Sequence, residues 1–368
     1  MTPDRRSELD ALCRREVVEA GVAPAAVVAV AAGPRLAVGA GGQRRRGPSE
    51  PAAPEMPFDL ASVSKPVFAA TAVRRARRGE LDLDAPLGRW LPEACDTPSA
   101  DVPLALLLSH RAGLVAHQTL FAPLVAQRGL QRSDLLRQAA AGRRAECSGP
   151  PPPAGFAPLY SDLGYLLAGE AVARAAALSL DELIAREVTE PLGLEMGSAR
   201  QWLARDAQRF FRAAPTEIVP WRGGELCGVV HDENAWALAG HGAAGHAGLF
   251  GTAEAVCRFG VALLDALAGR DDAWLRREDV EWMVKPRPGG DLRAGFDGKS
   301  ATGSSAGDRA SAQAFGHLGF TGTSLWCDPA TERAMVVLTN RVHPSREHIA
   351  IRSARPKLHD ALAAVPLD

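Results

Sequence analysis

Short apolar runs typical of β-strands lie at both ends of the chain, and helical patterns fill the middle. Residues 25–31 and 35–39 form one pair of such runs near the amino end. Residues 315–328 and 333–340 form a second pair near the carboxyl end. If the strands from the two ends pair in one sheet, a residue from a helix in the middle of the chain and a residue from a carboxyl-terminal strand can lie in the same cleft. The order therefore predicts an α/β domain made from both termini, with a helical domain inserted between them.

Hydrophobic periodicity predicts the remaining elements. We expect helices over 7–20, 62–78, 104–108, 133–141, 163–177, 180–188, 252–268 and 345–364. Proline-rich or glycine-rich composition predicts loops over 149–155, 223–248 and 289–312, and we expect the last of these to be mobile. The sheet domain is expected to take residues 1–70 and 240–368, and the helical domain residues 71–239.

The composition and charge of the chain exclude several classes of protein. Its 368 residues suffice for two domains or for one large mixed domain. Hydrophobic residues make up 46% and charged residues 23%, which are ordinary proportions for a folded protein and exclude global disorder. The 42 basic and 43 acidic side chains leave a net charge of −1. This balance gives no electrostatic footprint for nucleic acid or anionic lipid, so we expect neither as a partner.

The amino-terminal residues predict where the protein resides. A signal peptide needs an apolar core of about 7–15 residues directly after a basic start. Residues 1–19 are strongly charged instead, and the longest apolar stretch, residues 22–32, is too short to span a bilayer. We therefore expect a cytoplasmic protein with no membrane partner.

A serine and a lysine three positions apart form the first candidate for chemistry. The segment Ser62-Val63-Ser64-Lys65 contains one of only four lysines in the chain. If Ser62 opens a helix, Lys65 lies one turn further on the same face, and its amine can reach the serine hydroxyl. Burial would lower the pKa of Lys65 and let it accept the serine proton. The alternative is that Ser62 only caps the helix and Lys65 only faces solvent.

A tyrosine and a glycine-rich strand supply two more candidate groups. Tyr160 stands where a proline-rich loop meets a helix, and a nearby ammonium would lower its pKa toward the range of acid–base catalysis. The alternative for Tyr160 is a packed aromatic. The run 316–323 (GHLGFTGT) opens the carboxyl-terminal hairpin, where glycines permit close approach of a ligand. This run could place a backbone N–H and His317 at a cleft, although glycine-rich strand starts are common.

Together the three motifs resemble the serine β-lactamase and penicillin-binding-protein family. The likeness is greatest to its class C-like branch, which includes esterases, D-amino-acid peptidases, acyltransferases and β-lactamases. Further similar segments are 58–66 (FDLASVSKP), 106–114 (LLLSHRAGL), 160–169 (YSDLGYLLAG), 191–194 (PLGL), 245–252 (GHAGLFGT) and 316–329 (GHLGFTGTSLWCDP). The resemblance implies a β-lactamase/transpeptidase-like fold of the α/β (α+β) class. Such a fold has a central antiparallel sheet flanked by helices and an inserted all-helical domain.

The resemblance also implies a role for each matching residue. Ser62 would be the acylated nucleophile, and Lys65 and Tyr160 would share the transfer of its proton. The backbone N–H groups of Ser62 and Phe320 would form the oxyanion hole. The residues implied to bind the substrate are Asp162, His317 and Gly319. Neither a metal nor an organic cofactor is implied.

Departures from the family pattern point away from anionic substrates. Where many relatives carry the lysine and threonine of K-T-G, this chain has His317 and Leu318. Leucine cannot hydrogen-bond, and histidine is mostly neutral above its usual pKa near 6.5. Asp162 adds a negative charge where relatives often have asparagine. We therefore expect a serine hydrolase of the esterase or amidase kind that acts on a small ester or amide through an acyl-enzyme, with weak or absent β-lactamase activity.

Other activities stay open on the sequence alone. The alternatives are a β-lactamase, a D-Ala or D-amino-acid peptidase, an acyltransferase, and a binding or sensor module that no longer acylates. The presence of the serine, the lysine and the tyrosine together argues against the binding module. No particular oligomeric state is predicted.

Two other motifs are interpreted as structural. Residues 303–307 (GSSAG) match the G-x-S-x-G nucleophile elbow around Ser305, but that elbow must follow a buried strand and none is predicted there. His231, His241 and His246 lack the spacing of metal ligands on a helix. We expect these histidines to support the wall of the cleft and expect no metal site.

Overall fold

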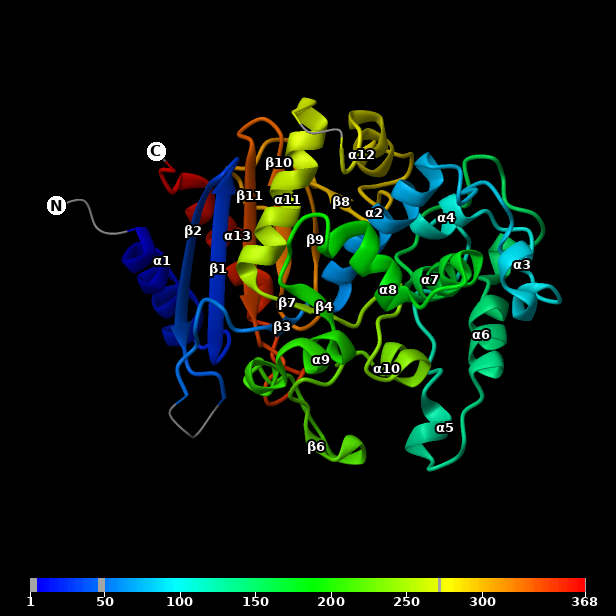
Figure 1. The fold of residues 1–368 in the computed structure, drawn as a ribbon, viewed down its shortest axis with the longest axis horizontal. Helices are drawn as coiled ribbons and strands as arrows, with labels where there is room; N and C mark the ends of the chain where they lie inside the picture. Colours follow the sequence, from blue (N-terminus) through cyan, green and yellow to red (C-terminus); the bar gives the residue numbers. More distant parts are fainter. Residues whose placement is uncertain (1–4, 46–49, 271–272, 368) are drawn as a thin grey trace.

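A six-stranded antiparallel sheet built from both ends of the chain is the largest element of the computed structural model (Figure 1). The structure describes residues 5–45, 50–270 and 273–367. The strand order is β2-β1-β11-β10-β9-β8. Strand β1 pairs with β11 in antiparallel register, with Val28 opposite Val337, so the predicted meeting of the two ends is confirmed. The strands are β1 (Ala25–Ala32), β2 (Arg35–Gly42), β8 (Asp297–Gly298), β9 (Phe315–Leu318), β10 (Ser324–Asp328) and β11 (Arg333–Thr339).

Strand β1 is apolar on both faces because helices cover both faces of the sheet. Val27 belongs to one buried cluster and its neighbour Val28 to another, since successive side chains of a strand point to opposite faces. Helix α11 (Ala253–Ala268) packs on the first face, and α1 (Arg5–Cys13) and α13 (Ile351–Ala364) pack on the second (Figure 1). The sheet is therefore the middle layer of three.

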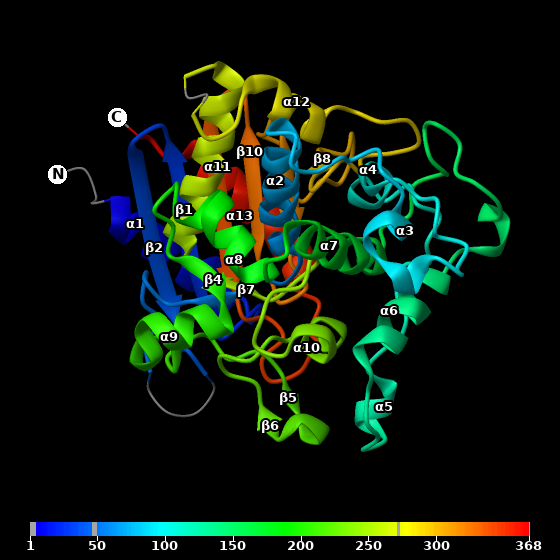
Figure 2. The same ribbon diagram turned by 45° about the vertical axis from the view of Figure 1, so that its right-hand side comes forward.

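Most of the other helices gather beside the sheet, on the side away from β2, whereas the helix over residues 199–210 lies below the sheet in both views (Figures 1 and 2). These other helices are α2 (Ser64–Arg77), α3 (Leu87–Trp90), α4 (Leu104–Leu108), α5 (Ala122–Val125), α6 (Arg132–Ala141), α7 (Asp162–Ala176), α8 (Leu180–Ile184), α9 (Ala199–Phe210), α10 (Glu233–Ala239) and α12 (Arg277–Val284). Two π-helical segments extend α1 and α8, namely Arg14–Glu19 and Ala185–Thr189. Short 3-10 turns occupy Ala61–Val63, Pro92–Ala94, Ala145–Cys147 and Pro220–Arg222.

Two small sheets tie distant segments together. The first has the order β3-β7-β4 and joins β3 (Phe58–Asp59), β7 (Leu249–Gly251) and β4 (Met196–Ser198). The second is a hairpin of β5 (Ile218–Val219) and β6 (Gly224–Glu225). Because β3 directly precedes the turn that carries Ser62, the first small sheet fixes the position of that serine against the 249–251 segment.

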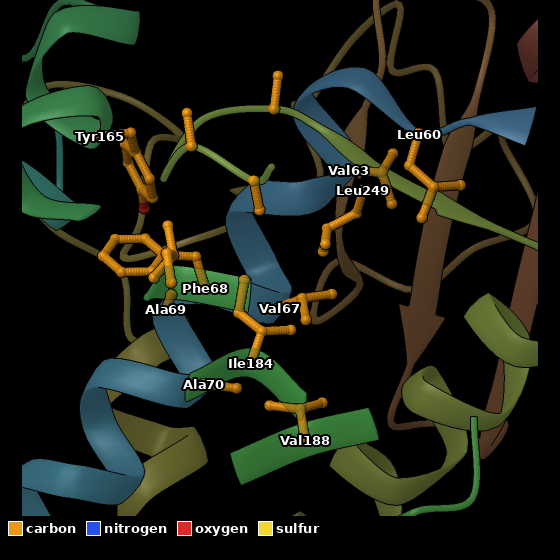
Figure 3. Packing of buried hydrophobic residues seen from close by; sticks show 14 of the residues in the cluster. Leu60, Val63, Val67, Phe68, Ala69, Ala70, Tyr165, Ile184, Val188 and Leu249 are labelled. Carbon is orange, nitrogen blue, oxygen red and sulfur yellow. The ribbon is translucent and has the colours of Figure 1, made fainter. Parts of the chain in front are cut away.

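Helix α2 is buried through most of its length and anchors the Ser62 turn (Figure 3). Phe68 lies edge-on to Tyr165 of α7, with ring centroids 6.0 Å apart. Figure 3 also shows Val67 beside Ile184 and Val188, which come from α8 and its extension. One buried hydrophobic cluster includes all these residues together with one face of the large sheet. The predicted boundaries between a sheet domain and a helical domain stay a prediction.

Several expected elements differ from the structure. The loop expected over 223–248 contains α10, which begins because the Asp232 side chain accepts a hydrogen bond from the Ala235 N–H and caps it. The loop expected over 289–312 contains β8, and the closing helix starts at Ile351 instead of residue 345. Helices α9 and α12 were not predicted. Among the described residues, no single helix is long and apolar enough to cross a membrane, although α7 and the bent α8 region pass that test as a pair.

Removal of the Phe68 ring should destabilise the protein strongly. Phe68→Ala leaves a cavity between α2 and α7 in fully buried surroundings, and such changes cost about 3–5 kcal/mol in the free energy of unfolding. Urea unfolding followed by circular dichroism measures this loss. Phe211→Ala is the matched control, because the Phe211 ring is largely exposed, and it should change stability by less than about 0.5 kcal/mol. Equal losses in the two variants would contradict the described packing.

Candidate active site

Ser62 and Lys65 meet through a 3-10 turn. Ser62 lies in the turn Ala61–Val63, and α2 begins at Ser64, so the expectation that Ser62 opens the α-helix is wrong by two residues. The two side chains still lie together, because positions three apart eclipse each other in a 3-10 turn. Lys65 Nζ lies 2.8 Å from Ser62 Oγ.

The buried ammonium of Lys65 is the centre of the site. Its Nζ lies 2.7 Å from the Tyr160 hydroxyl and 2.7 Å from Asp162 Oδ1, in addition to Ser62 Oγ. The backbone carbonyl of His246 lies at 3.4 Å. An ammonium has three N–H donors, so the three short contacts use all of them. The lysine thereby holds side chains from α2 and from the start of α7 around the serine, and the alternative of a solvent-facing lysine is excluded.

The pKa of Tyr160 moves in the direction opposite to the expected one. Burial raises the pKa of Tyr160 well above its usual value, and the charge of Asp162 raises it further. The expectation that a nearby ammonium lowers this pKa is wrong, because burial is the largest effect on the phenol and the negative charge of Asp162 acts in the same direction. Tyr160 is therefore a phenol at neutral pH and holds a proton that it can donate.

His110 is a residue of the site that sequence reasoning missed. Its ring stacks on the Tyr160 ring, with centroids 4.6 Å apart. His110 Nδ1 accepts a hydrogen bond from the Ser161 N–H at 3.1 Å, and the His110 carbonyl accepts one from the Leu159 N–H at 3.1 Å. Burial, followed by the charge of Lys65, lowers the pKa of His110 well below its usual value, so the ring is neutral. His110 thus holds the backbone on both sides of Tyr160, and we call this segment, residues 159–161, the tyrosine loop.

The turn after β9 is fixed to the backbone that precedes Ser62. Thr321 Oγ1 donates to the Asp59 carbonyl at 2.8 Å, and Thr323 Oγ1 donates to the Leu60 carbonyl at 2.9 Å. These bonds hold the 319–323 turn beside the Ser62 turn. Within the described residues, neither the Ser62 N–H nor the Phe320 N–H has a hydrogen-bond partner. The two predicted oxyanion-hole donors are therefore available on adjacent segments.

Asp59 is a second residue that sequence reasoning missed. Ala61 has a φ of 47°, a left-handed conformation that is costly for a residue with a Cβ and is frequent at functional sites. Asp59 Oδ1 accepts the Ala61 N–H at 2.8 Å, and Asp59 Oδ2 accepts the His231 N–H at 2.7 Å. Burial raises the pKa of Asp59. The carboxyl group therefore holds the strained turn that presents Ser62.

Comparisons with known proteins agree with this geometry. The sequence model of the Beta-lactamase family matches residues 14–357. This chain belongs to the Beta-lactamase family. It is 24% identical over 311 residues to a Salmonella agona (strain SL483) protein named "Putative D-alanyl-D-alanine carboxypeptidase", covering 78% of this chain and 69% of that protein. A Salmonella gallinarum (strain 287/91 / NCTC 13346) protein of the same name is 29% identical over 198 residues, which are 50% of this chain and 45% of that protein.

Solved structures show the same fold. The structure titled "EstCE1, a hydrolase with promiscuous acyltransferase activity" matches with a TM-score of 0.70 and 22% identity over 96% of this chain and 98% of that chain. The D-amino acid amidase from Ochrobactrum anthropi SV3 matches with a TM-score of 0.70 and 19% identity over 98% of both chains. The predicted β-lactamase/transpeptidase-like fold is confirmed, and the chain is a β-lactamase-family serine hydrolase.

In this serine hydrolase, the position of the family's K-T-G lysine is occupied by a neutral ring. His317 is buried, and its Nδ1 donates to the Leu318 carbonyl at 2.9 Å. Burial, followed by the charge of Lys65, lowers the pKa of His317 to about 3. The His317 ring centroid lies 5.9 Å from that of Tyr160. His317 therefore supplies no positive charge for a substrate carboxylate at neutral pH.

Gly319 and Asp162 complete the predicted substrate-binding residues. A Cβ on Gly319 would lie 2.6 Å from the Leu60 carbonyl oxygen and 1.9 Å from Thr323 Oγ1. Only glycine therefore lets the strand end approach the Ser62 turn this closely. Asp162 pairs with Lys65. The roles of both residues toward a substrate stay predictions.

The remaining motifs lie around the site as supports. His246 Nε2 lies 2.9 Å from Asp232 Oδ1, and His231 Nε2 lies 3.1 Å from Glu217 Oε2. Across the described ranges, no group of three or more metal-ligating side chains gathers. The 303–307 loop follows the two-residue strand β8 but opens no helix, as a nucleophile elbow would, and it packs against α13 on the face of the sheet opposite to α11.

The buried His317 ring should make stability depend on pH. An unfolded chain protonates this residue near pH 6.5, whereas the folded protein does so only near pH 3. The neutral ring therefore makes its full contribution to the free energy of unfolding above about pH 6.5. This contribution decreases as the pH falls from about 6.5 toward 3, because only the unfolded chain takes up a proton there. Between pH 7 and pH 5 the loss from this residue is about 2 kcal/mol.

His317→Gln should remove that loss because glutamine does not titrate. Urea unfolding at pH 7 and pH 5 measures the difference between the variant and the wild type. His117→Gln is the control, because the His117 side chain is exposed, and it should retain the wild-type pH dependence. A pH dependence unchanged in His317→Gln would show that this ring is not held neutral in the folded protein.

Proposed function

We propose that this serine hydrolase cleaves an uncharged ester or amide through an acyl-enzyme formed on Ser62. The contact of one buried ammonium with Ser62 Oγ, the Tyr160 hydroxyl and Asp162 supports the proposal. A packing role requires no such set, because burying polar groups is costly unless they are paired. In a hydrolase the same set provides a nucleophile, a proton path and a counter-charge.

Acylation follows from the order of these contacts. Ser62 Oγ attacks the carbonyl carbon, and the N–H groups of Ser62 and Phe320 donate to the oxygen as it becomes negative. The Tyr160 phenol gives its proton to the departing oxygen or nitrogen. The Ser62 proton replaces it along the hydrogen bonds through Lys65. The products of this step are the acyl-Ser62 ester and a free alcohol or amine.

Deacylation reverses the proton path. A water molecule takes the place of the leaving group and attacks the acyl carbon, while its proton passes to Tyr160 and Lys65. Ser62 Oγ leaves as the new acid forms and regains a proton from the same groups. The oxyanion hole serves both steps because each passes through a tetrahedral intermediate.

The charges around the site favour an uncharged substrate. Lys65 is already paired with Asp162, and His317 is neutral. Near the oxyanion turn, Arg341 Nε donates to the Phe320 carbonyl at 2.8 Å, and Arg355 donates to the Gly319 carbonyl. These cations are engaged with protein groups, so a substrate carboxylate would meet the negative charge of Asp162 without a free partner. We therefore propose weak turnover of anionic β-lactams.

Hydrolysis of p-nitrophenyl acetate and of an anionic cephalosporin tests the proposal. Ser62→Ala should lower kcat/KM for the acetate by at least about 1,000-fold, the scale seen when a nucleophile is removed. Ser305→Ala, which alters the other serine motif, should leave kcat/KM within about twofold. Wild-type kcat/KM for the cephalosporin should be at least about 100-fold lower than for the acetate.

Two results would contradict the proposal. Retained esterase activity in Ser62→Ala would place the nucleophile elsewhere. Efficient hydrolysis of the cephalosporin would overturn the proposed preference for uncharged substrates while leaving the nucleophile in place.

A further inference from the structure

Exposed apolar side chains gather at one groove. The groove has a volume of about 600 Å³ and lies between α5 and the segment 217–221. Val125, Ile218 and Trp221 line it, and each of these side chains is between a third and a half exposed. Scattered exposed apolar side chains are normal, but a gathered set marks a binding surface. Figures 1 and 2 both place α5 and the β5–β6 hairpin at the same end of the molecule.

An aromatic stack joins the two walls of the groove. Phe121, which precedes α5, stacks on Trp221 of the other wall, with centroids 5.7 Å apart and planes inclined by 2°. Trp236 of α10 meets Trp221 edge-on, with centroids 5.9 Å apart. The walls are therefore held at a fixed spacing by contacts between rings.

The charged groups of the groove are paired with one another. Arg346 Nε donates to Glu217 Oε2 at 2.6 Å, and the same guanidinium donates to Glu233. Glu217 also bonds to the ring of His231. Since these charges satisfy each other, what the groove offers a ligand is chiefly apolar surface.

Side-chain and backbone contacts connect the walls of the groove to the segments that carry the catalytic residues. On one wall, the Arg346 guanidinium lies 5.8 Å from the centroid of the Phe320 ring, which is itself half exposed. The His231 ring also stacks on Phe320, at 5.7 Å. Toward the other wall, the Asp162 N–H donates to the Ala116 carbonyl at 3.1 Å, and the chain runs on from Ala116 to Thr119, which lines the groove.

We propose that this groove binds the apolar acyl chain of the substrate. The proposal rests on the proposed function and adds the substrate class, which is an ester or amide of a linear fatty acid of about eight carbons. The carbonyl would lie at Ser62 under the Phe320 N–H, and the chain would pass Phe320 toward Trp221. Each methylene buried in a fully closed site raises the affinity about fourfold. In an open groove that covers about half of the chain surface, each methylene should raise the affinity about twofold.

The dependence of kcat/KM on acyl length tests the proposal. For p-nitrophenyl esters, the six extra methylenes of octanoate should raise wild-type kcat/KM about 60-fold over acetate. Val125→Ser combined with Ile218→Ser should lower the octanoate value about tenfold and leave the acetate value within about twofold. Both side chains are partly exposed, so folding should be retained. Phe211→Ala, an exposed aromatic away from the groove, should change neither value.

Two results of this experiment would overturn the proposal. One is an octanoate value no higher than the acetate value in the wild type. The other is an equal loss for both esters in the double variant. If the wild type hydrolysed neither ester, the proposed function would be wrong. A measurement of ligand binding would then test separately whether the groove binds an acyl chain.

Binding to Ser62→Ala separates the groove from the chemistry. Isothermal titration calorimetry of this variant with octanamide and with acetamide needs no turnover. Octanamide should bind at least about 30-fold more tightly, and Val125→Ser with Ile218→Ser should remove most of that advantage. Equal binding of the two amides, or an advantage that survives the serine substitutions, would show that the chain binds elsewhere.

Discussion

The charge on the buried Lys65 side chain is the constraint on which the rest of the structure depends. A cation removed from water costs several kilocalories per mole unless acceptors surround it. Here the acceptors are Ser62 Oγ, the Tyr160 hydroxyl and Asp162, which come from the Ser62 turn and from the start of α7. The distance between helix α2 and helix α7 must therefore stay fixed. The contact between the Phe68 and Tyr165 rings, which joins the same two helices, helps to maintain this distance.

The large sheet provides the second half of the site and explains why both ends of the chain belong to it. Strand β9 ends in a turn whose threonines bond to the Asp59 and Leu60 carbonyls. This clamp holds the turn that contains Phe320 against the backbone that precedes Ser62, and its position depends on the register of β9 against β10. The neutral state of His317 follows from the same burial. The neutral His317 and the substrate preference proposed from it thus both depend on the burial of this wall of the cleft.

The strands at the two ends predicted a sheet made from both termini, and the three-residue spacing predicted the contact of Ser62 with Lys65. The resemblance to the family implied the particular fold and the place of Tyr160 in the site. Contacts set by tertiary packing could not be predicted in either way. His110 and Asp59 were missed because they act through the backbone of the tyrosine loop and of Ala61, which no periodicity reveals. The pKa direction of Tyr160 was wrong because its burial and the position of Asp162 are properties of the folded chain.

A crystal structure of the protein after reaction with a fluorophosphonate would test the central claim most directly. We expect a covalent bond from Ser62 Oγ to phosphorus, with the phosphonyl oxygen about 2.7–3.1 Å from the backbone nitrogens of Ser62 and Phe320. Lys65 should remain in contact with Tyr160 and Asp162 in that structure. An adduct on another residue, or a phosphonyl oxygen directed away from these two nitrogens, would contradict the account.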